Sequence, residues 1–352
     1  MQNETQTGLF GLPSQRQNSM IVIQPVSWEV TTSYGSGTSR GPEAILAASP
    51  QLDLFDIELG EMYKVGYHLE ALDTKMRDEN DRLKALANSV LEEWDEFGET
   101  KESVKPKIAE INRGCDQMVK TVEARTKSIL AEGKIPGLIG GDHSSPLGAI
   151  QAISEKLKGD FGVLHIDAHA DLRLAYQGYT HSHASIMRNV MLMKTPPKKL
   201  VQVAIRDFCK EEYDYIQSSE GRIQTFFDEK LKTRLLEGES WDRISQGIIS
   251  ALPQNVYVSF DIDGLSPEFC PSTGTPVPGG LSFDQALHLL KVLGQSGRRI
   301  VGFDLNEVAP SPDGSEWDGN VGARILFKLC GWTAHTNGGG KMVDSRATGR
   351  GL

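Results

Sequence analysis

The sequence predicts an α/β fold built on a parallel β-sheet with helices on both faces. From residue 135 onward, short apolar segments of strand character alternate with amphipathic segments of helical character. Strands that are separated by helices in this way are typical of parallel sheets. Ligands bind beyond the carboxyl ends of such strands, so the polar residues that follow each strand are the first candidates for a functional site.

The chain is expected to divide into an arm, one large domain and a tail. Residues 1–19 are polar and rich in Gln and Asn, and they predict an N-terminal arm. Residues 20–332 predict a single domain, in which residues 70–132 form two or more charged surface helices without catalytic content. Residues 333–352 are Gly-rich and lack apolar periodicity, which predicts a flexible tail.

Apolar runs and their spacing place the elements of this domain. The expected strands cover residues 20–26, 135–139, 161–166, 199–205, 221–227, 255–260 and 299–303. The expected helices begin near Pro42 and Pro146, or cover residues 241–252, 283–293 and 322–329.

Charge and composition restrict the class of protein. The formal net charge of −10 argues against a nucleic-acid-binding surface. No apolar run approaches the length of a membrane span, and the N-terminal residues lack a signal-peptide pattern. The four cysteines are far apart and show no zinc-site spacing. We therefore expect a cytoplasmic protein with reduced thiols.

The segment His165 to Asp171 reads His-Ile-Asp-Ala-His-Ala-Asp and directly follows an expected strand. On an extended backbone, Asp167, His169 and Asp171 share one face, because successive side chains point to opposite faces. Two carboxylates and an imidazole on one edge of a buried strand would repel each other or lie unpaired without a cation. The segment therefore predicts a metal site.

Two further strand ends carry residues of the same kind. His143 follows the strand at 135–139, and the pair Asp261 and Asp263 ends the strand at 255–260 with the same alternate spacing. Together these segments supply two imidazoles and four carboxylates, which suit two divalent ions of intermediate hardness such as Mn²⁺. Nickel is the alternative ion, because the ligand set does not exclude it.

The segments GGDHS, DAHAD and SFDID, in this order, resemble the ureohydrolase (arginase/agmatinase) family. The likeness includes the loop at residues 28–45 and the segments 272–280 and 302–310, and it spans roughly residues 20–332. It implies a three-layer α/β/α sandwich around a parallel sheet of about eight strands. It also implies a homotrimer or homohexamer.

The resemblance implies two Mn²⁺ ions per subunit and a division of the ligands between them. One ion is held by His143, Asp167, Asp171 and Asp261, and the other by His169, Asp167, Asp261 and Asp263, so that Asp167 and Asp261 bridge. In this family a metal-bridging hydroxide attacks a guanidino or formimino carbon and releases urea or an equivalent product. Asp171 is expected to act in catalysis as well as in metal binding.

The family likeness also assigns roles around the metals. Glu307 matches the acid that pairs with the substrate guanidinium, for which a carboxylate offers a two-point partner. His183 matches a histidine that delivers a proton to the leaving amine, a task suited to imidazole. His181 is the alternative proton donor, because it lies two residues earlier in the same loop.

Departures from the family pattern leave the substrate open. The default expectation is an agmatinase-like enzyme that cleaves a linear guanidino C–N bond of a small cationic substrate. The alternatives are guanidine, guanidinobutyrate or guanidinopropionate, and formimidoylglutamate. Arg173 is expected to meet a substrate carboxylate in the last case, and Trp317 is expected to line the pocket together with Trp28, Tyr34 and Tyr176.

Two hypotheses come from other classes of protein. The chain could be a non-catalytic family member that binds metal for structure or assembly, against which the intact ligands, Glu307 and His183 speak. A deacetylase on a similar scaffold is disfavoured, because six candidate ligands exceed what a single zinc ion needs.

Overall fold

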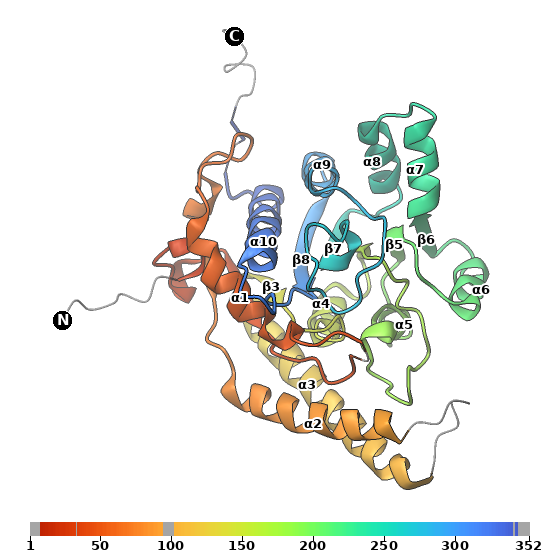
Figure 1. Ribbon diagram of the computed structural model, residues 1–352. Coiled ribbons are helices and arrows are strands. Elements are labelled where there is room, and N and C mark those ends of the chain that lie inside the picture. The colour runs from red at the N-terminus through yellow and green to blue at the C-terminus, as the bar shows by residue number, and fades with distance from the viewer. Residues whose placement is uncertain (1–7, 33, 94–101, 341, 344–352) are drawn as a thin grey trace, which may run out of the picture.

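A computed structural model describes residues 8–32, 34–93, 102–340 and 342–343. Within these residues, eight parallel strands form one sheet in the order β2-β1-β3-β8-β7-β4-β5-β6 (Figure 1). The strands are β1 (Ile21–Pro25), β2 (Tyr67–Leu69), β3 (Ile135–Ile139), β4 (Gly162–Ile166), β5 (Lys199–Ile205), β6 (Ile223–Phe227), β7 (Asn255–Asp261) and β8 (Arg299–Asn306). The predicted parallel sheet is confirmed.

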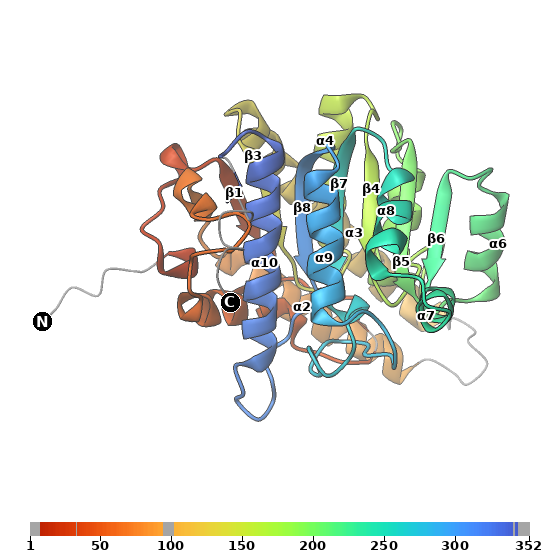
Figure 2. The same cartoon turned by 90° about the horizontal axis from the view of Figure 1, so that it is seen from above.

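Helices cover both faces of the sheet and complete three layers (Figures 1 and 2). One apolar core lies beneath α1 (Gly41–Ala48), α7 (Asp228–Leu236), α8 (Trp241–Ser250), α9 (Phe283–Gln295) and α10 (Trp317–Thr336). The other core lies beneath α2 (Thr74–Glu92), α3 (Lys105–Ala131), α4 (Leu147–Leu157), α5 (Ile186–Met191) and α6 (Lys210–Ser218). The predicted α/β/α sandwich is confirmed.

The ends of the predicted domain differ from expectation. Leu9 and Phe10 of the expected arm are buried, and the Phe10 ring packs edge-on against Phe327 of α10. At the other end, α10 continues to Thr336, four residues into the expected tail, because Thr333 and Ala334 are fully buried. The remaining residues of the expected tail include 341 and 344–352, which lie outside the described residues.

Sequence reasoning missed four short α-helices and strands, and it ended β7 one residue too early and β8 three residues too early. The elements β2, α5, α6 and α7 are at most nine residues long, too short to show a clear apolar period. Strand β8 was expected to end at Phe303 but continues through Asp304, Leu305 and Asn306. Its polar residues break the apolar run, yet the backbone stays paired with β7 up to the partners Asp261 and Asn306.

Strand order brings the predicted motifs together. The strands β3, β8, β7 and β4 are neighbours at the centre of the sheet, and all are parallel. The GGDHS and DAHAD segments follow β3 and β4, the SFDID segment forms and follows the end of β7, and Glu307 follows β8. All four therefore meet at the carboxyl edge of the sheet, where ligands are expected to bind.

Candidate metal centre and active site

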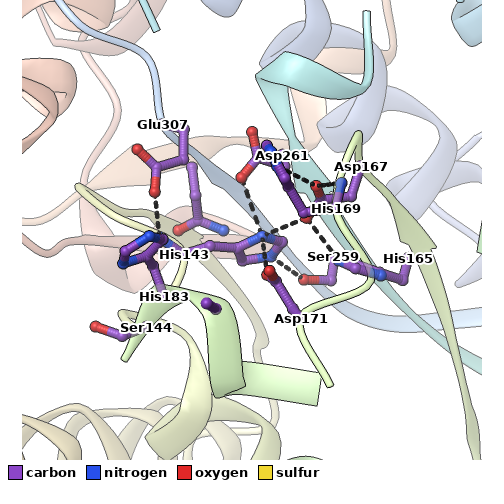
Figure 3. Close-up of polar contacts among 12 residues, drawn as sticks. His143, Ser144, His165, Asp167, His169, Asp171, His183, Ser259, Asp261 and Glu307 are labelled. Carbon is purple, nitrogen blue, oxygen red and sulfur yellow. Dashed lines mark hydrogen bonds and ion pairs between the residues drawn. The ribbon is translucent and has the colours of Figure 1, made fainter. Parts of the chain in front are cut away.

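All six predicted metal ligands lie together at this edge (Figure 3 labels five of them). The first group surrounds Nδ1 of His143, which lies 2.9 Å from Asp167 Oδ2, 3.1 Å from Asp261 Oδ2 and 3.4 Å from Asp171 Oδ2. These are the four residues that the family resemblance assigns to one ion.

The second group surrounds His169. Its Nδ1 lies 3.1 Å from Asp263 Oδ2 and 3.5 Å from Asp167 Oδ1. Asp167 thus presents Oδ2 to the first group and Oδ1 to the second, which is the placement that a bridging carboxylate requires. Asp261 presents Oδ2 to His143 of the first group, and its Oδ1 accepts the backbone N–H of Asp263, a residue of the second group.

The electrostatics of the cluster fit a pair of divalent cations. Asp167, Asp171, Asp261 and Asp263 are all buried. Burial and the neighbouring carboxylates raise the pKa of Asp171 and of Asp261 well above the usual range of an aspartate. Four buried carboxylates around two imidazoles would repel each other, and bound divalent cations would offset that repulsion.

A hydrogen-bond chain fixes which nitrogen of His143 faces the cluster. Ser259 Oγ donates to Asp304 Oδ1 at 2.9 Å, so it accepts from the Nε2–H of His143 at 2.8 Å. The proton of the neutral ring then sits on Nε2, and Nδ1 keeps its lone pair for a metal. Ser259 lies two residues before Asp261 on the same strand face, so strand alternation could have identified it from the sequence.

Glu307 lies beside the metal cluster with one oxygen free. The side chain is buried, and Oε1 accepts the backbone N–H of His143 at 2.9 Å. Oε2 has no hydrogen-bond partner among the described residues, and Gly274 gives it space, because a Cβ there would lie 3.0 Å from this oxygen. Burial, with the charges of Asp261 and Asp142, raises the pKa of Glu307 well above its usual range. A buried, unpartnered carboxylate oxygen of this kind fits a cationic ligand.

His183 lines the pocket above the cluster, whereas His181 does not. Nδ1 of His183 lies 3.4 Å from Thr31 Oγ1, and the same hydroxyl donates to Asp142 Oδ2 at 3.2 Å. Burial, with the positive charges of His169 and Lys84, lowers the pKa of His183 to about 3. His181 instead pairs with Asp116 of α3 at 2.7 Å. Position therefore favours His183 as the residue that acts on a ligand.

Helix α2 supports the loop that carries Thr31. Asn80 Oδ1 accepts the backbone N–H of Glu29 at 2.7 Å, and Lys84 Nζ donates to the carbonyl of Thr32 at 2.6 Å. The carboxylate of Glu29 in turn accepts from the backbone N–H groups of Gly37 and Ser39. Residues 70–132 were expected to form surface helices without catalytic content, and the residue pattern did not indicate that α2 anchors a loop beside the pocket.

The pocket has a volume of about 400 Å³ and a mixed aromatic and acidic wall. Besides Asp171, His169 and His183, its wall includes Tyr34, Tyr176, Phe208, Asp207, Glu212 and Arg173. The Arg173 guanidinium lies 5.0 Å from the centre of the Tyr176 ring, and its Nε lies 3.8 Å from Glu212 Oε2. Arg173 thus lies in the pocket, as predicted, but with an acidic partner beside it.

Two of the predicted pocket aromatics lie elsewhere. Trp317 is 49% exposed at the start of α10, and its indole N–H donates to the carbonyl of Glu268 on the surface. Trp28 is buried in the core beneath α2 and α3. Neither is among the residues that line this pocket, so the structure does not bring Trp317 to it.

Comparison with known proteins agrees with this geometry. The model of the Arginase family matches residues 19–331. The chain is 32% identical over 317 residues to N(1)-aminopropylagmatine ureohydrolase of Synechocystis sp., with 90% of this chain and 89% of that protein covered. It is also 32% identical over 323 residues to the agmatinase of Halalkalibacterium halodurans, with 90% and 93% covered.

Solved structures share the fold. Proclavaminate amidino hydrolase from Streptomyces clavuligerus superposes with a TM-score of 0.71 at 23% identity, with 94% of this chain and 97% of that chain covered. None of the described helices is long and apolar enough to cross a membrane. The extent of the family match and of the relatives' similarity shows that this chain belongs to the arginase family of ureohydrolases.

Proposed function

We propose that this protein is a binuclear-metal ureohydrolase that removes urea from a linear guanidino compound with an extended cationic chain. Agmatine and N(1)-aminopropylagmatine are the proposed substrates, because they are the compounds in the names of the relatives that cover most of the chain. The observation that most supports this proposal is the position of Glu307 Oε2. This carboxylate oxygen is buried beside the metal cluster and has no hydrogen-bond partner among the described residues.

The pocket wall favours a cationic chain over an anionic one. Asp207 is an exposed residue of the pocket wall next to His169, and its carboxylate makes no ion pair within the described residues. Tyr34, Tyr176 and Phe208 offer aromatic faces to an ammonium group. Arg173, the residue that would attract a substrate carboxylate, already lies near Glu212. This pairing argues against guanidinobutyrate, guanidinopropionate and formimidoylglutamate.

The residues of the chain divide the reaction between binding and proton transfer. Two divalent ions, when bound, lower the pKa of water and offset the charge of the carboxylates. Glu307 binds and orients the guanidinium through its free oxygen. As water adds to the guanidino carbon and the C–N bond to the chain breaks, the neutral His183 ring takes up the proton that the water loses and passes it to the leaving amine. The products are urea and the free alkylamine.

We propose Mn²⁺ as the resident ion, with Ni²⁺ as the alternative. Carboxylates outnumber imidazoles in the cluster, and the described residues within it include no thiolate. We also keep the prediction of a homotrimer or homohexamer, which light scattering on the purified protein would test.

Urea release from purified protein loaded with Mn²⁺ or Ni²⁺ tests the proposal. The panel is agmatine, N(1)-aminopropylagmatine, guanidine, guanidinobutyrate, guanidinopropionate and formimidoylglutamate. We expect the highest kcat/KM for agmatine or N(1)-aminopropylagmatine. A higher value for a carboxylate-bearing compound or for guanidine would overturn the substrate class, and no turnover of any compound would favour the non-catalytic family member.

A further inference from the structure

His165 is a fully buried histidine of β4 that lies next to Asp167 of the metal cluster (Figure 3). Its Nε2 lies 2.8 Å from Asp167 Oδ2, and its Nδ1 lies 3.1 Å from the amide nitrogen of Gln202 on β5. By distance alone, His165 groups with His143, Asp167 and Asp171 as a candidate metal ligand. Whether it can bind metal depends on which ring nitrogen carries the proton.

The orientation of the Gln202 amide is fixed by two independent contacts. Its nitrogen donates to the carbonyl of Ala170 at 2.7 Å, and its oxygen accepts from Thr225 Oγ1 of β6 at 2.9 Å. Turning the amide over would place its oxygen against the Ala170 carbonyl oxygen, and neither atom carries a proton to share. The NH₂ group must therefore face both Ala170 and His165.

This orientation sets the tautomer of His165. Because the Gln202 NH₂ group points at Nδ1, that nitrogen is the acceptor and carries the lone pair. In the neutral ring the proton then sits on Nε2, which faces Asp167 Oδ2. A nitrogen that bears a proton has no lone pair for a metal ion.

We propose that His165 is a positioning residue and not a metal ligand: its Nε2–H donates to Asp167 Oδ2 and holds this carboxylate so that its two oxygens face the two ligand groups. The inference rests on the proposed function in one respect, that Asp167 bridges two ions. The chain Thr225–Gln202–His165–Asp167 crosses three adjacent strands, so the rigid sheet sets the angle of the carboxylate.

The tautomer can be observed directly by ¹⁵N NMR. Protein with ¹⁵N-labelled histidine is measured near neutral pH without metal and after addition of Zn²⁺, which is diamagnetic, and a His165→Gln variant assigns the signal. We expect the Nε2–H tautomer in both states. An Nδ1–H tautomer in either state, or metal-induced loss of the Nε2 proton, would overturn the proposal. The measurement needs no substrate, so it stays readable if the proposed activity fails.

Metal titration tests whether His165 strengthens metal binding through Asp167. Mn²⁺ binding is measured by calorimetry for His165→Leu, which removes the donor, and for His165→Gln, whose amide can replace it. We expect His165→Leu to keep two ions per chain but to bind them roughly 10- to 100-fold more weakly, with partial recovery in His165→Gln. A drop to one ion per chain, or an unchanged affinity, would contradict a positioning role.

A second pair of variants separates an effect on the metal centre from a general loss of stability. Gln202→Leu removes the group that sets the tautomer, and Gln24→Leu removes a matched, fully buried strand glutamine that contacts Thr126 of α3. We expect weaker Mn²⁺ binding for Gln202→Leu only, although both variants lose thermal stability. Equal affinities in the two variants would show that the Gln202 contact does not act on the metal centre.

Discussion

Lys84 of α2 donates from its ammonium group to the backbone carbonyl of Thr32, at 2.6 Å, across the boundary between a surface helix and the active-site loop. Thr31, the residue before, contacts both Asp142 and His183. Helix α2 thus supports, through Thr32 and Thr31, the position of His183, the candidate proton donor. The contact has a direct test.

Lys84→Met should lower kcat without loss of the metals. Removing the ammonium frees the Thr32 carbonyl and loosens the loop, so Thr31 no longer holds His183 in place. A lost charged hydrogen bond corresponds to about 1.5–3 kcal/mol, or roughly a 10- to 100-fold fall in kcat if it is expressed in the transition state. Arg82→Met is the matched control, since Arg82 lies on the same helix and, among the described residues, its ion pairs are with the surface residues Glu79 and Glu110. Equal kinetics for the two variants would refute the role of Lys84.

Glu307→Gln should reduce kcat/KM for the guanidino substrate by about 100-fold, because an amide replaces the buried negative charge that faces the guanidinium. Metal content should stay at the wild-type level, since the backbone N–H of His143 can still be accepted by the amide oxygen. Glu316→Gln, at an exposed glutamate that contacts Gln51, serves as the control. A wild-type kcat/KM in Glu307→Gln would exclude this residue from substrate binding.

His183→Asn should lower kcat by roughly 10²- to 10⁴-fold, the usual contribution of a general acid or base, with a smaller effect on KM. His181→Asn removes the neighbouring histidine that pairs with Asp116 outside the pocket, and it should leave kcat unchanged. Steady-state kinetics of the two variants decide between them. A larger loss in His181→Asn would reverse the assignment.

Stability should also depend on His183 at acidic pH. The folded state holds its pKa at about 3, below the ordinary value of about 6.5, because of burial. Below about pH 6.5 the histidine becomes protonated in the unfolded chain but stays neutral in the folded chain. The free energy of unfolding therefore keeps its full contribution from His183 above that pH and loses it as the pH falls toward 3. In metal-free protein, the urea midpoint of His183→Asn should therefore fall less between pH 7 and pH 4 than that of the wild type. Parallel curves would show that His183 titrates normally in the folded state.

The parts of the site that are local in sequence could be predicted from it. Residue spacing and parallel strand ends correctly grouped Asp167, His169 and Asp171 with His143 and Asp261. The first three residues do not share an extended strand face, however, because β4 ends at Ile166 and Asp171 has a positive φ of 54°. His165 and Ser259 lie two residues before Asp167 and Asp261, so strand alternation could also have identified them from the sequence.

The parts that depend on packing could not be predicted. Lys84 and Thr32 are 52 residues apart, and only the seating of α2 against the loop brings them together. Packing also sets the position of Trp317, whose ring is half exposed at the first turn of α10 and donates to the carbonyl of Glu268. Charge runs on α2 gave no sign that one lysine faces inward.

Counting bound metal in three proteins tests the central claim most directly. Manganese per chain is measured after dialysis at limiting Mn²⁺ for the wild type, Asp167→Ala and His169→Ala. Because Asp167 faces both histidine groups and His169 only one, we predict two ions in the wild type, loss of both in Asp167→Ala and loss of chiefly one in His169→Ala. Full retention of metal in both variants would contradict the assignment of this cluster as a two-metal site.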